Sequence, residues 1–183
     1  MTIYLAFLRG VNVGGHRKIP MAKLSVMMTS MGFHHVRTYI QSGNIVFAAG
    51  DEHHSAIELK ISGRIQAVFG FEVPVIIRTE EAIRHIISCN PFIANTASGT
   101  ENLFLCLLKS PPDQENLHKL SEKAFAGEQL IAVDDHLFLK IDGSYGKAKL
   151  NNNYIEGKLK MDATTRNWKT MMAMISLAES IRP

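Results

Sequence analysis

The alternation of hydrophobic and polar positions changes period several times along the first 79 residues. Short apolar runs with strand composition cover residues 3–9, 36–40, 44–48 and 71–79, and segments with helical spacing cover 20–31 and 53–69. Pro20 suits the start of a helix, whereas Gly32 and Gly70 suit helix ends. The order β-α-β-β-α-β predicts an α+β fold, the ferredoxin-like or alpha-beta plait.

The second half of the chain repeats this order in part. Thr79, followed by two glutamates, is a good cap for a helix that reaches about Cys89. Beyond it we expect a strand, a helix, a hairpin of two strands and two further helices, over residues 102–109, 113–126, 128–133, 136–141, 149–159 and 165–180. The sequence therefore predicts two ferredoxin-like units packed together, one over residues 1–79 and a second plait-like unit with C-terminal helices over 80–183.

The composition is that of a globular protein with its own core. Of the 183 residues 46% are hydrophobic, and no run approaches the roughly 18 to 20 apolar residues of a membrane helix. The first residues lack the basic segment, long apolar stretch and cleavage site of a signal peptide. We therefore expect a cytoplasmic protein with no membrane association.

Charge is unevenly distributed along the chain. Residues 1–50 contain five Lys or Arg side chains and no acid, residues 51–137 contain thirteen acids against seven bases, and residues 138–183 contain eight bases against four acids. Two basic ends would attract an anion, a phosphorylated ligand or nucleic acid if they meet in space. Alternatively, the acidic middle segment balances the two ends within the molecule.

The predicted plait brings two loops of the first unit together. Its first and second strands are parallel, so the loop at 10–19 and the hairpin at 41–44 lie at the same end of the sheet. The helix that starts near Pro20 also directs its free N–H groups to this end. We expect an anion site there, formed by Arg9, Gly10, Asn12, Gly14, Gly15, Gln41, Ser42 and Asn44.

The glycines of this loop do not complete a known nucleotide motif. Gly10 and Gly15 have the spacing of a Walker loop, but His16 and Arg17 stand where that loop needs Lys and Ser or Thr. The G-x-G-x-x-G fingerprint of dinucleotide-binding proteins is absent. The glycines could instead supply positive φ angles in a long connection, although a loop of this length between strand and helix is more often functional.

A second group of polar residues lies near the C-terminus. The candidates for a basic wall on the same pocket are Tyr145, Lys147, Lys149, Arg166 and Asn167. The alternative is structural, with Thr164 or Thr165 as the cap of the last helix and Trp168 as a core anchor.

Several segments together carry a family resemblance. They are YLAFLRGVNVGGHRKIPMAKL, RTYIQSGNIVFAA, VPVIIRT, NPF, GKAKL and ATTRNWKTM, in this order through nearly the whole chain. With these motifs the chain resembles the uncharacterised bacterial family known as domain of unknown function 1697 (DUF1697). The resemblance implies two ferredoxin-like α+β units and no transferable activity. Ala148 stands where family members often have Ser, so a hydroxyl is not required there.

Three kinds of function remain open. The first is binding of a small anionic or phosphorylated ligand at the loop, with or without catalysis, and with any cofactor unknown. The second is RNA binding, because the plait is also a scaffold of RNA-recognition domains and Tyr4, Tyr39 and Phe47 lie on neighbouring strands. The third is a role in protein interaction, with the oligomeric state left open. The histidine pairs at 34–35 and 53–54 point to different sides of their elements, so we predict no metal site.

Overall fold

The chain forms two compact units, each built around its own sheet. The computed structural model describes residues 1–93 and 99–182. The first unit comprises Met1–Ser88 and Met172–Pro183, and the second comprises Cys89–Met171. The sequence placed a boundary near Thr79; the first unit of the structure also includes the helix that follows Thr79 and the end of the last helix.

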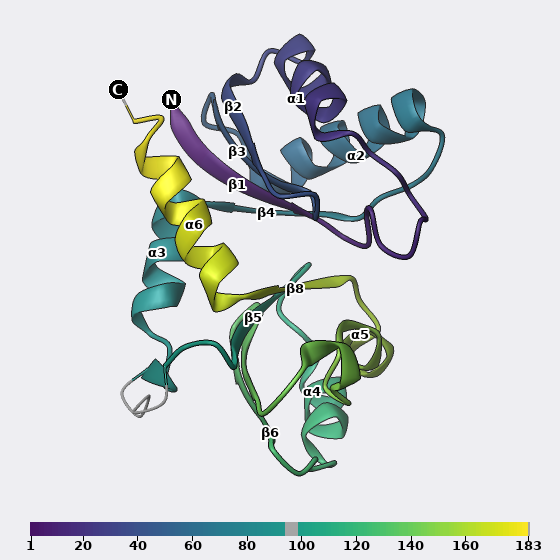
Figure 1. Ribbon diagram of the computed structural model, residues 1–183, viewed down its shortest axis with the longest axis vertical. Coiled ribbons are helices and arrows are strands. Elements are labelled where there is room, and N and C mark those ends of the chain that lie inside the picture. Colours follow the sequence, from purple (N-terminus) through teal and green to yellow (C-terminus); the bar gives the residue numbers. More distant parts are fainter. Residues whose placement is uncertain (94–98, 183) are drawn as a thin grey trace. The chain divides into compact units, whose positions relative to one another are not determined.

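The first unit has the topology of a ferredoxin-like plait. Its elements are β1 Thr2–Leu8, α1 Met21–Ser30, β2 His34–Tyr39, β3 Asn44–Ala49, α2 His54–Phe69 and β4 Val75–Thr79. The sheet order is β2-β3-β1-β4, and every neighbouring pair is antiparallel. Helices α1 and α2 cover one face of this sheet (Figure 1). The plait predicted for this unit is confirmed.

Local sequence explains where these helices begin and end. α1 follows Pro20 and is closed by Gly32, whose φ is 87°. The side chain of His53 caps α2, which ends at Gly70 with a φ of 81°. Pro74 directly precedes β4, an edge strand, where a missing N–H costs little in the ladder.

The core of this unit lies between the sheet and its two helices. Tyr4 and Phe47 stack there with ring centroids 5.7 Å apart, and both are buried. The hydroxyl of Tyr4 donates to the carbonyl of Glu52 (3.0 Å). Because both rings are enclosed beneath the helices, they are not available to stack on bases. The RNA-binding interpretation therefore loses two of the three aromatic side chains that suggested it.

The second unit contains a complete plait as well. Its elements are β5 Leu103–Leu108, α4 Gln114–Ser121, β6 Glu128–Val133, β7 His136–Ile141, the short 3₁₀ helix η2 Tyr145–Lys147, α5 Asn152–Leu159 and β8 Ala163–Asn167. The sheet order is β6-β7-β5-β8, again antiparallel throughout. α4 and α5 lie on the same side of this sheet (Figure 1).

The last part of this unit corrects a sequence prediction. Residues 165–180 were expected to form one helix, but β8 occupies 163–167 and the final helix α6 is Trp168–Glu179. Thr164 and Thr165 pair with β5, which suits their β-branched side chains. The cap is Asn167, whose side-chain oxygen accepts the N–H of Thr170 (2.8 Å).

The other helices of the second unit are shorter than expected. α4 ends at Ser121 rather than near 126, and α5 begins at Asn152 rather than near 149.

Within the part of the chain that the structure describes, no helix has the length and apolarity to cross a membrane.

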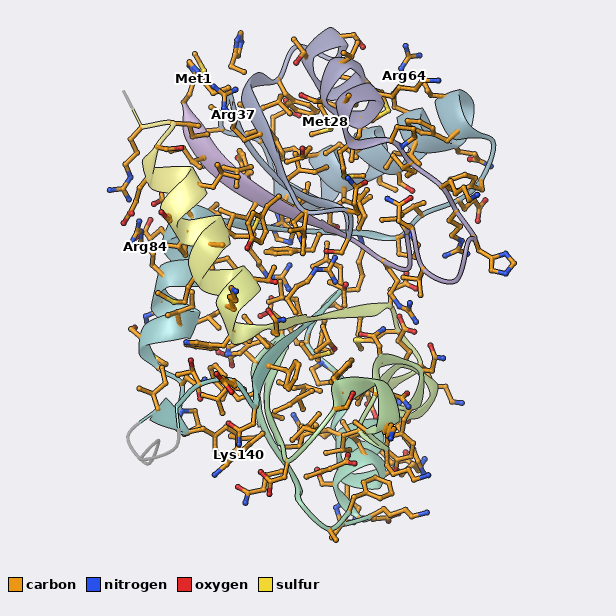
Figure 2. The ribbon with its side chains drawn as sticks, in the orientation of Figure 1. Met1, Met28, Arg37, Arg64, Arg84 and Lys140 are labelled. Carbon is orange, nitrogen blue, oxygen red and sulfur yellow. The ribbon has the colours of Figure 1, made fainter. Side chains whose placement is uncertain are left out.

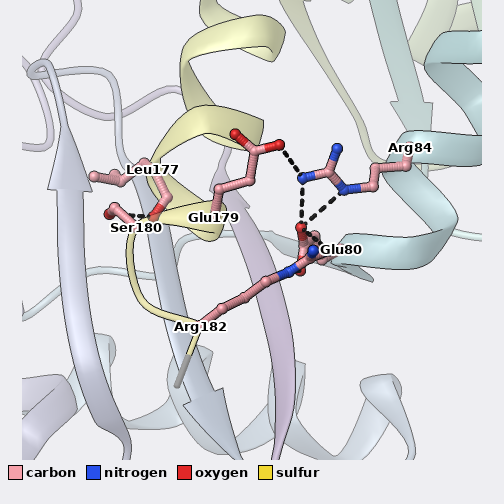
Figure 3. A network of polar contacts seen from close by, with 6 residues as sticks. All are labelled: Glu80, Arg84, Leu177, Glu179, Ser180 and Arg182. Carbon is pink, nitrogen blue, oxygen red and sulfur yellow. Dashed lines mark hydrogen bonds and ion pairs between the residues drawn. The ribbon is translucent and has the colours of Figure 1, made fainter.

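A cluster of charged side chains holds the end of the chain to the first unit. Helix α3, Glu80–Ser88, lies beside the last turns of α6 (Figure 1). Glu80 is almost fully buried and accepts hydrogen bonds from Arg84 (2.8 Å) and Arg182 (2.7 Å). Arg84 also donates to Glu179 (2.7 Å), as Figure 3 shows. We call these four residues the C-terminal clamp.

The clamp favours the charged form of Arg84. Hydrogen bonds to Glu179 and Glu80 raise the pKa of Arg84 above its ordinary value. Arg84 therefore stays charged throughout the physiological pH range.

Removing the central carboxylate should destabilise the protein. We expect Glu80→Ala to lower the free energy of unfolding by about 2 kcal/mol, because two guanidinium groups lose a charged acceptor. Urea denaturation followed by circular dichroism measures this loss.

Glu115→Ala is the matched control. It removes an exposed ion pair with Lys119 (2.6 Å) on α4, and exposed pairs contribute little. Equal losses in the two variants would show that the clamp contributes no more than an ordinary surface pair.

Candidate functional site

The glycine-rich loop after β1 is a miniature hairpin. Val13 and His16 form an antiparallel bridge, in which the N–H of His16 donates to the carbonyl of Val13 (3.1 Å). Gly14 and Gly15 form the tip with φ angles of 58° and 80°, the left-handed values that a tight two-residue turn requires. Both glycines are exposed, and their conformational role is to make this turn.

Asn12 fixes the miniature hairpin to two neighbouring segments. Its amide nitrogen donates to the carbonyls of Ile19 (3.0 Å) and Gln41 (2.7 Å). Its amide oxygen accepts the N–H of Ile19 (2.9 Å). One side chain therefore joins the loop to the approach of α1 and to the β2–β3 turn. The structure thus brings together the two segments that the plait topology placed at one end of the sheet.

Gly43 allows β1 and the β2–β3 turn to approach closely. The N–H of Leu8 donates to the carbonyl of Gly43 (2.8 Å). A Cβ atom at Gly43 would lie 2.6 Å from Leu8 and 2.7 Å from Val11, and the φ of Gly43 is 72°. Both the conformation and the available space therefore require glycine at this position.

Asn44 and Ser42 take part in the bonding of the turn itself. The amide nitrogen of Asn44 donates to the carbonyl of Tyr39 (3.2 Å) and to the hydroxyl of Ser42 (2.9 Å). Asn44 has no exposed surface, so its contribution to a site is the shape of the turn. Ile40, which precedes the turn, has a φ of 48°, an unfavourable value for a β-branched residue.

A shallow cavity opens between the miniature hairpin and the β2–β3 turn. Its volume is about 390 Å³, and it is lined by Asn12, Gly15, Lys18, Ile19, Pro20 and Gln41. Lys18 was not among the predicted site residues. Its place two positions before Pro20, at the mouth of α1, is the sequence signal that could have identified it.

Helix α1 begins at this cavity without a side-chain cap. Pro20, the residue before the helix, makes no capping hydrogen bond, and the first turn contains no acid. The first backbone N–H groups of a helix lack intrahelical partners and carry a partial positive charge. Lys18 lines the same cavity. Its ammonium group and the helix N-terminus both attract a negative charge to this place.

Arg9 and Gly10 lie beside the cavity rather than in its lining. Both are half-buried at the end of β1. The N–H of Arg9 donates to the carbonyl of Pro74 (2.9 Å). A guanidinium nitrogen of Arg17 lies 3.5 Å from the position that a Cβ of Gly10 would occupy. Gly10, whose φ is 69°, therefore lies next to the guanidinium group of Arg17.

The C-terminal candidates belong to the second unit and have structural contacts there. Tyr145 stacks on Phe104 with ring centroids 4.7 Å apart and packs against the core. Lys147 is exposed at the end of η2. Arg166 donates to the hydroxyl of Thr164 (2.7 Å), and Asn167 caps α6. Their grouping with the residues of the loop remains a prediction.

A carboxylate holds the GKAKL segment in the second unit. Glu128 of β6 accepts the N–H groups of Lys149 (2.8 Å) and Leu150 (2.6 Å). Two adjacent backbone donors that could have bound an external anion are thereby satisfied within the protein. Nothing in the local sequence links Glu128 to a segment 21 residues away.

The expectation that adjacent histidines point to different sides is wrong for the pair at 53–54, whose rings lie together. The rings of His53 and His54 stack with centroids 4.4 Å apart, and His53 caps α2. Over residues 1–93 and 99–182, no three His, Cys, Asp or Glu side chains are grouped as metal ligands.

A pair of glycine substitutions separates backbone strain from steric overlap. We expect Gly43→Ala to destabilise the protein by about 3 kcal/mol, because the methyl group overlaps the core side chains Leu8 and Val11. Gly15→Ala shares the positive φ but has nothing within 4 Å, so we expect about 1 kcal/mol. Thermal or urea denaturation measures both losses, and equal values would contradict the close approach at Gly43.

The comparisons with known proteins agree with this architecture. The model of a family described as a protein of unknown function (DUF1697) matches residues 1–138. Among solved structures, a conserved bacterial protein from Streptococcus pneumoniae is similar over 97% of this chain and 98% of its own, with 23% sequence identity and a TM-score of 0.75. That likeness supports the fold of two plait-like units. No protein of curated function matches the chain. The family match covers most of the sequence, and the chain belongs to the DUF1697 family.

Proposed function

We propose that this protein binds a small anionic ligand, most simply one with a phosphate group, in the cavity between the miniature hairpin and the β2–β3 turn. The observation that carries the proposal is the coincidence of Lys18 and the uncapped start of α1 on one cavity. An ammonium group and free helix N–H groups are both features that proteins use to bind phosphate.

The charge of the surrounding chain supports an anion. The first 50 residues contain no acid, and Arg17 and Lys18 are both exposed in the loop itself. A carboxylate near the cavity would compete for these cations, and this part of the chain supplies none. The local field therefore favours an incoming negative charge.

The size and rigidity of the cavity suit a small molecule. Its volume of about 390 Å³ is near the lower end of ordinary ligand pockets, about 300 to 1,000 Å³. Asn12 holds the two walls at fixed separation through its bonds to Ile19 and Gln41. A preorganised wall lowers the entropy cost of binding. The exposed amide of Gln41 is positioned to orient the bound group.

The side chains of the lining support binding rather than a particular reaction. They include one amine, two amides and no carboxylate, thiol or hydroxyl. The amide of Asn12 is already bonded to Ile19 and Gln41, so the amine of Lys18 and the amide of Gln41 are left to hold and orient an anion. These groups do not form a nucleophile and base pair. We therefore restrict the proposal to ligand recognition.

Neutralising Lys18 should weaken binding of pyrophosphate and inorganic phosphate. We expect Lys18→Gln to raise the dissociation constant about tenfold, or about 1.4 kcal/mol, because one charge-assisted contact is lost. The measurement is a titration of the full chain at about 50 mM salt, followed by amide chemical shifts of residues 15–23.

Lys60→Gln removes the same charge from α2 in the same unit and serves as the control. Lys60 pairs with Glu52 and does not line the cavity. The affinity of the Lys60→Gln variant for pyrophosphate should therefore match that of the wild type. An equal loss of affinity in both variants would show that only the net charge of the protein matters, and it would reject this cavity as the binding site. Shift changes confined to residues outside 12–23 and 41–44 would reject it as well.

A further inference from the structure

The outer side of helices α1 and α2 forms a second cationic surface, distinct from the loop cavity. A groove of about 430 Å³ runs between the two helices, with Lys23, Val26 and Ser30 on one wall and Arg64 and Val68 on the other. On each helix these positions recur every three or four residues, so each wall is a single helical stripe. Figure 2 places Arg64 on the outside of this helical layer, whereas Met28 is fully buried.

Apolar side chains are exposed along this groove. Val26 is 71% exposed and Val68 46% exposed. Clusters of exposed apolar residues in a concave surface are typical of recognition sites, whereas isolated ones are not.

The charged side chains of the groove have no partner among the residues that the structure describes. In the described part of the chain, neither the side chain of Lys23 nor that of Arg64 makes a hydrogen bond or ion pair. Glu58 is the one acid in the sequences of α1 and α2. It is buried, and its carboxylate accepts the N–H of Ile77 (2.8 Å). The lining of the groove is therefore cationic and apolar and contains no carboxylate, whereas the nearby acids Glu52 and Glu72 contact Lys60 and Gln66 elsewhere on α2.

We propose that this groove binds an amphipathic helix of a partner protein that carries acidic residues beside its apolar stripe. The apolar stripe would cover Val26 and Val68, and its carboxylates would pair with Lys23 and Arg64. A helix laid between two helices buries its side chains in the groove that their stripes leave open. The groove from Ala22 to Ser30 spans about 12 Å, or two turns, at about 1.5 Å per residue.

The concave shape favours a helix over a membrane surface, and the absence of acid on either wall disfavours a second copy of the same face. Two copies of this groove would bring Lys23 and Arg64 against like charges, which opposes self-association. The occupant therefore differs from this surface in charge.

A designed peptide tests the proposal on the full chain. The probe has about 14 residues, with Leu at every third or fourth position and Glu on both flanks of that stripe. A second peptide has Lys in place of every Glu. We expect the Glu peptide to bind with at least about tenfold higher affinity than the Lys peptide at low salt. Fluorescence anisotropy measures the affinity, and amide chemical shifts of residues 22–30 and 64–68 report the location.

Charge reversal in the protein completes the experiment. Arg64→Glu should lower the affinity for the Glu peptide about tenfold, and the double variant Lys23→Glu/Arg64→Glu should lower it further. Both variants should bind the Lys peptide more tightly than the wild type does. Lys119→Glu on α4 makes the same reversal elsewhere and should leave both affinities unchanged. Lys18→Gln should also leave them unchanged, which separates this surface from the anion cavity.

Several results would overturn the inference. Equal affinity for the two peptides, or an unchanged affinity of the Arg64→Glu variant for the Glu peptide, would show that the groove does not recognise acidic residues. Sedimentation of the wild type as a dimer that Arg64→Glu dissociates would assign the groove to a second copy. Binding to vesicles with anionic lipid, lost in the double variant, without binding of the Glu peptide would assign it to a membrane.

Discussion

The pairing of β1 with both β3 and β4 is the constraint on which the first unit depends. It places Leu8 against Gly43 and Arg9 against Pro74, so both neighbours reach the end of β1. Since β3 lies between β1 and β2, the turn that joins β2 to β3 must end beside the loop that leaves β1. The bond from Asn12 to Gln41 is possible because this geometry is already fixed.

The parts of the fold that the sequence predicts are those that depend on local pattern. Glycines at 32 and 70 end helices and Thr79 begins one, because these effects involve only the adjacent turn. β8 was missed for the opposite reason. Residues 163–167 contain no apolar run, and they form a strand because β5, more than fifty residues earlier, offers them a free edge. Tertiary context here overrides the local preference.

The candidate site divides in the same way. Its location follows from topology, but the roles of its side chains depend on which polar groups are already satisfied by distant residues. From the sequence, Asn12 and Asn44 could each contact a ligand or stabilise the fold. Their hydrogen bonds to Ile19, Gln41 and Tyr39 show that they stabilise the fold. The acid-free first 50 residues have consequences at two places on α1. Its N-terminus opens on the loop cavity, and its outer face forms one wall of the groove.

The C-terminal clamp makes the first unit discontinuous in sequence. The chain leaves this unit after Ser88 and returns to it at Met172, with the whole second unit between. The contacts of Glu80 with Arg182 join residues 102 positions apart, so they form only after a very long loop has closed. During synthesis the second unit can therefore fold while the first still lacks its last helix. The order of assembly is thus set by the covalent path, and the final step in building the N-terminal unit must wait for the C-terminus.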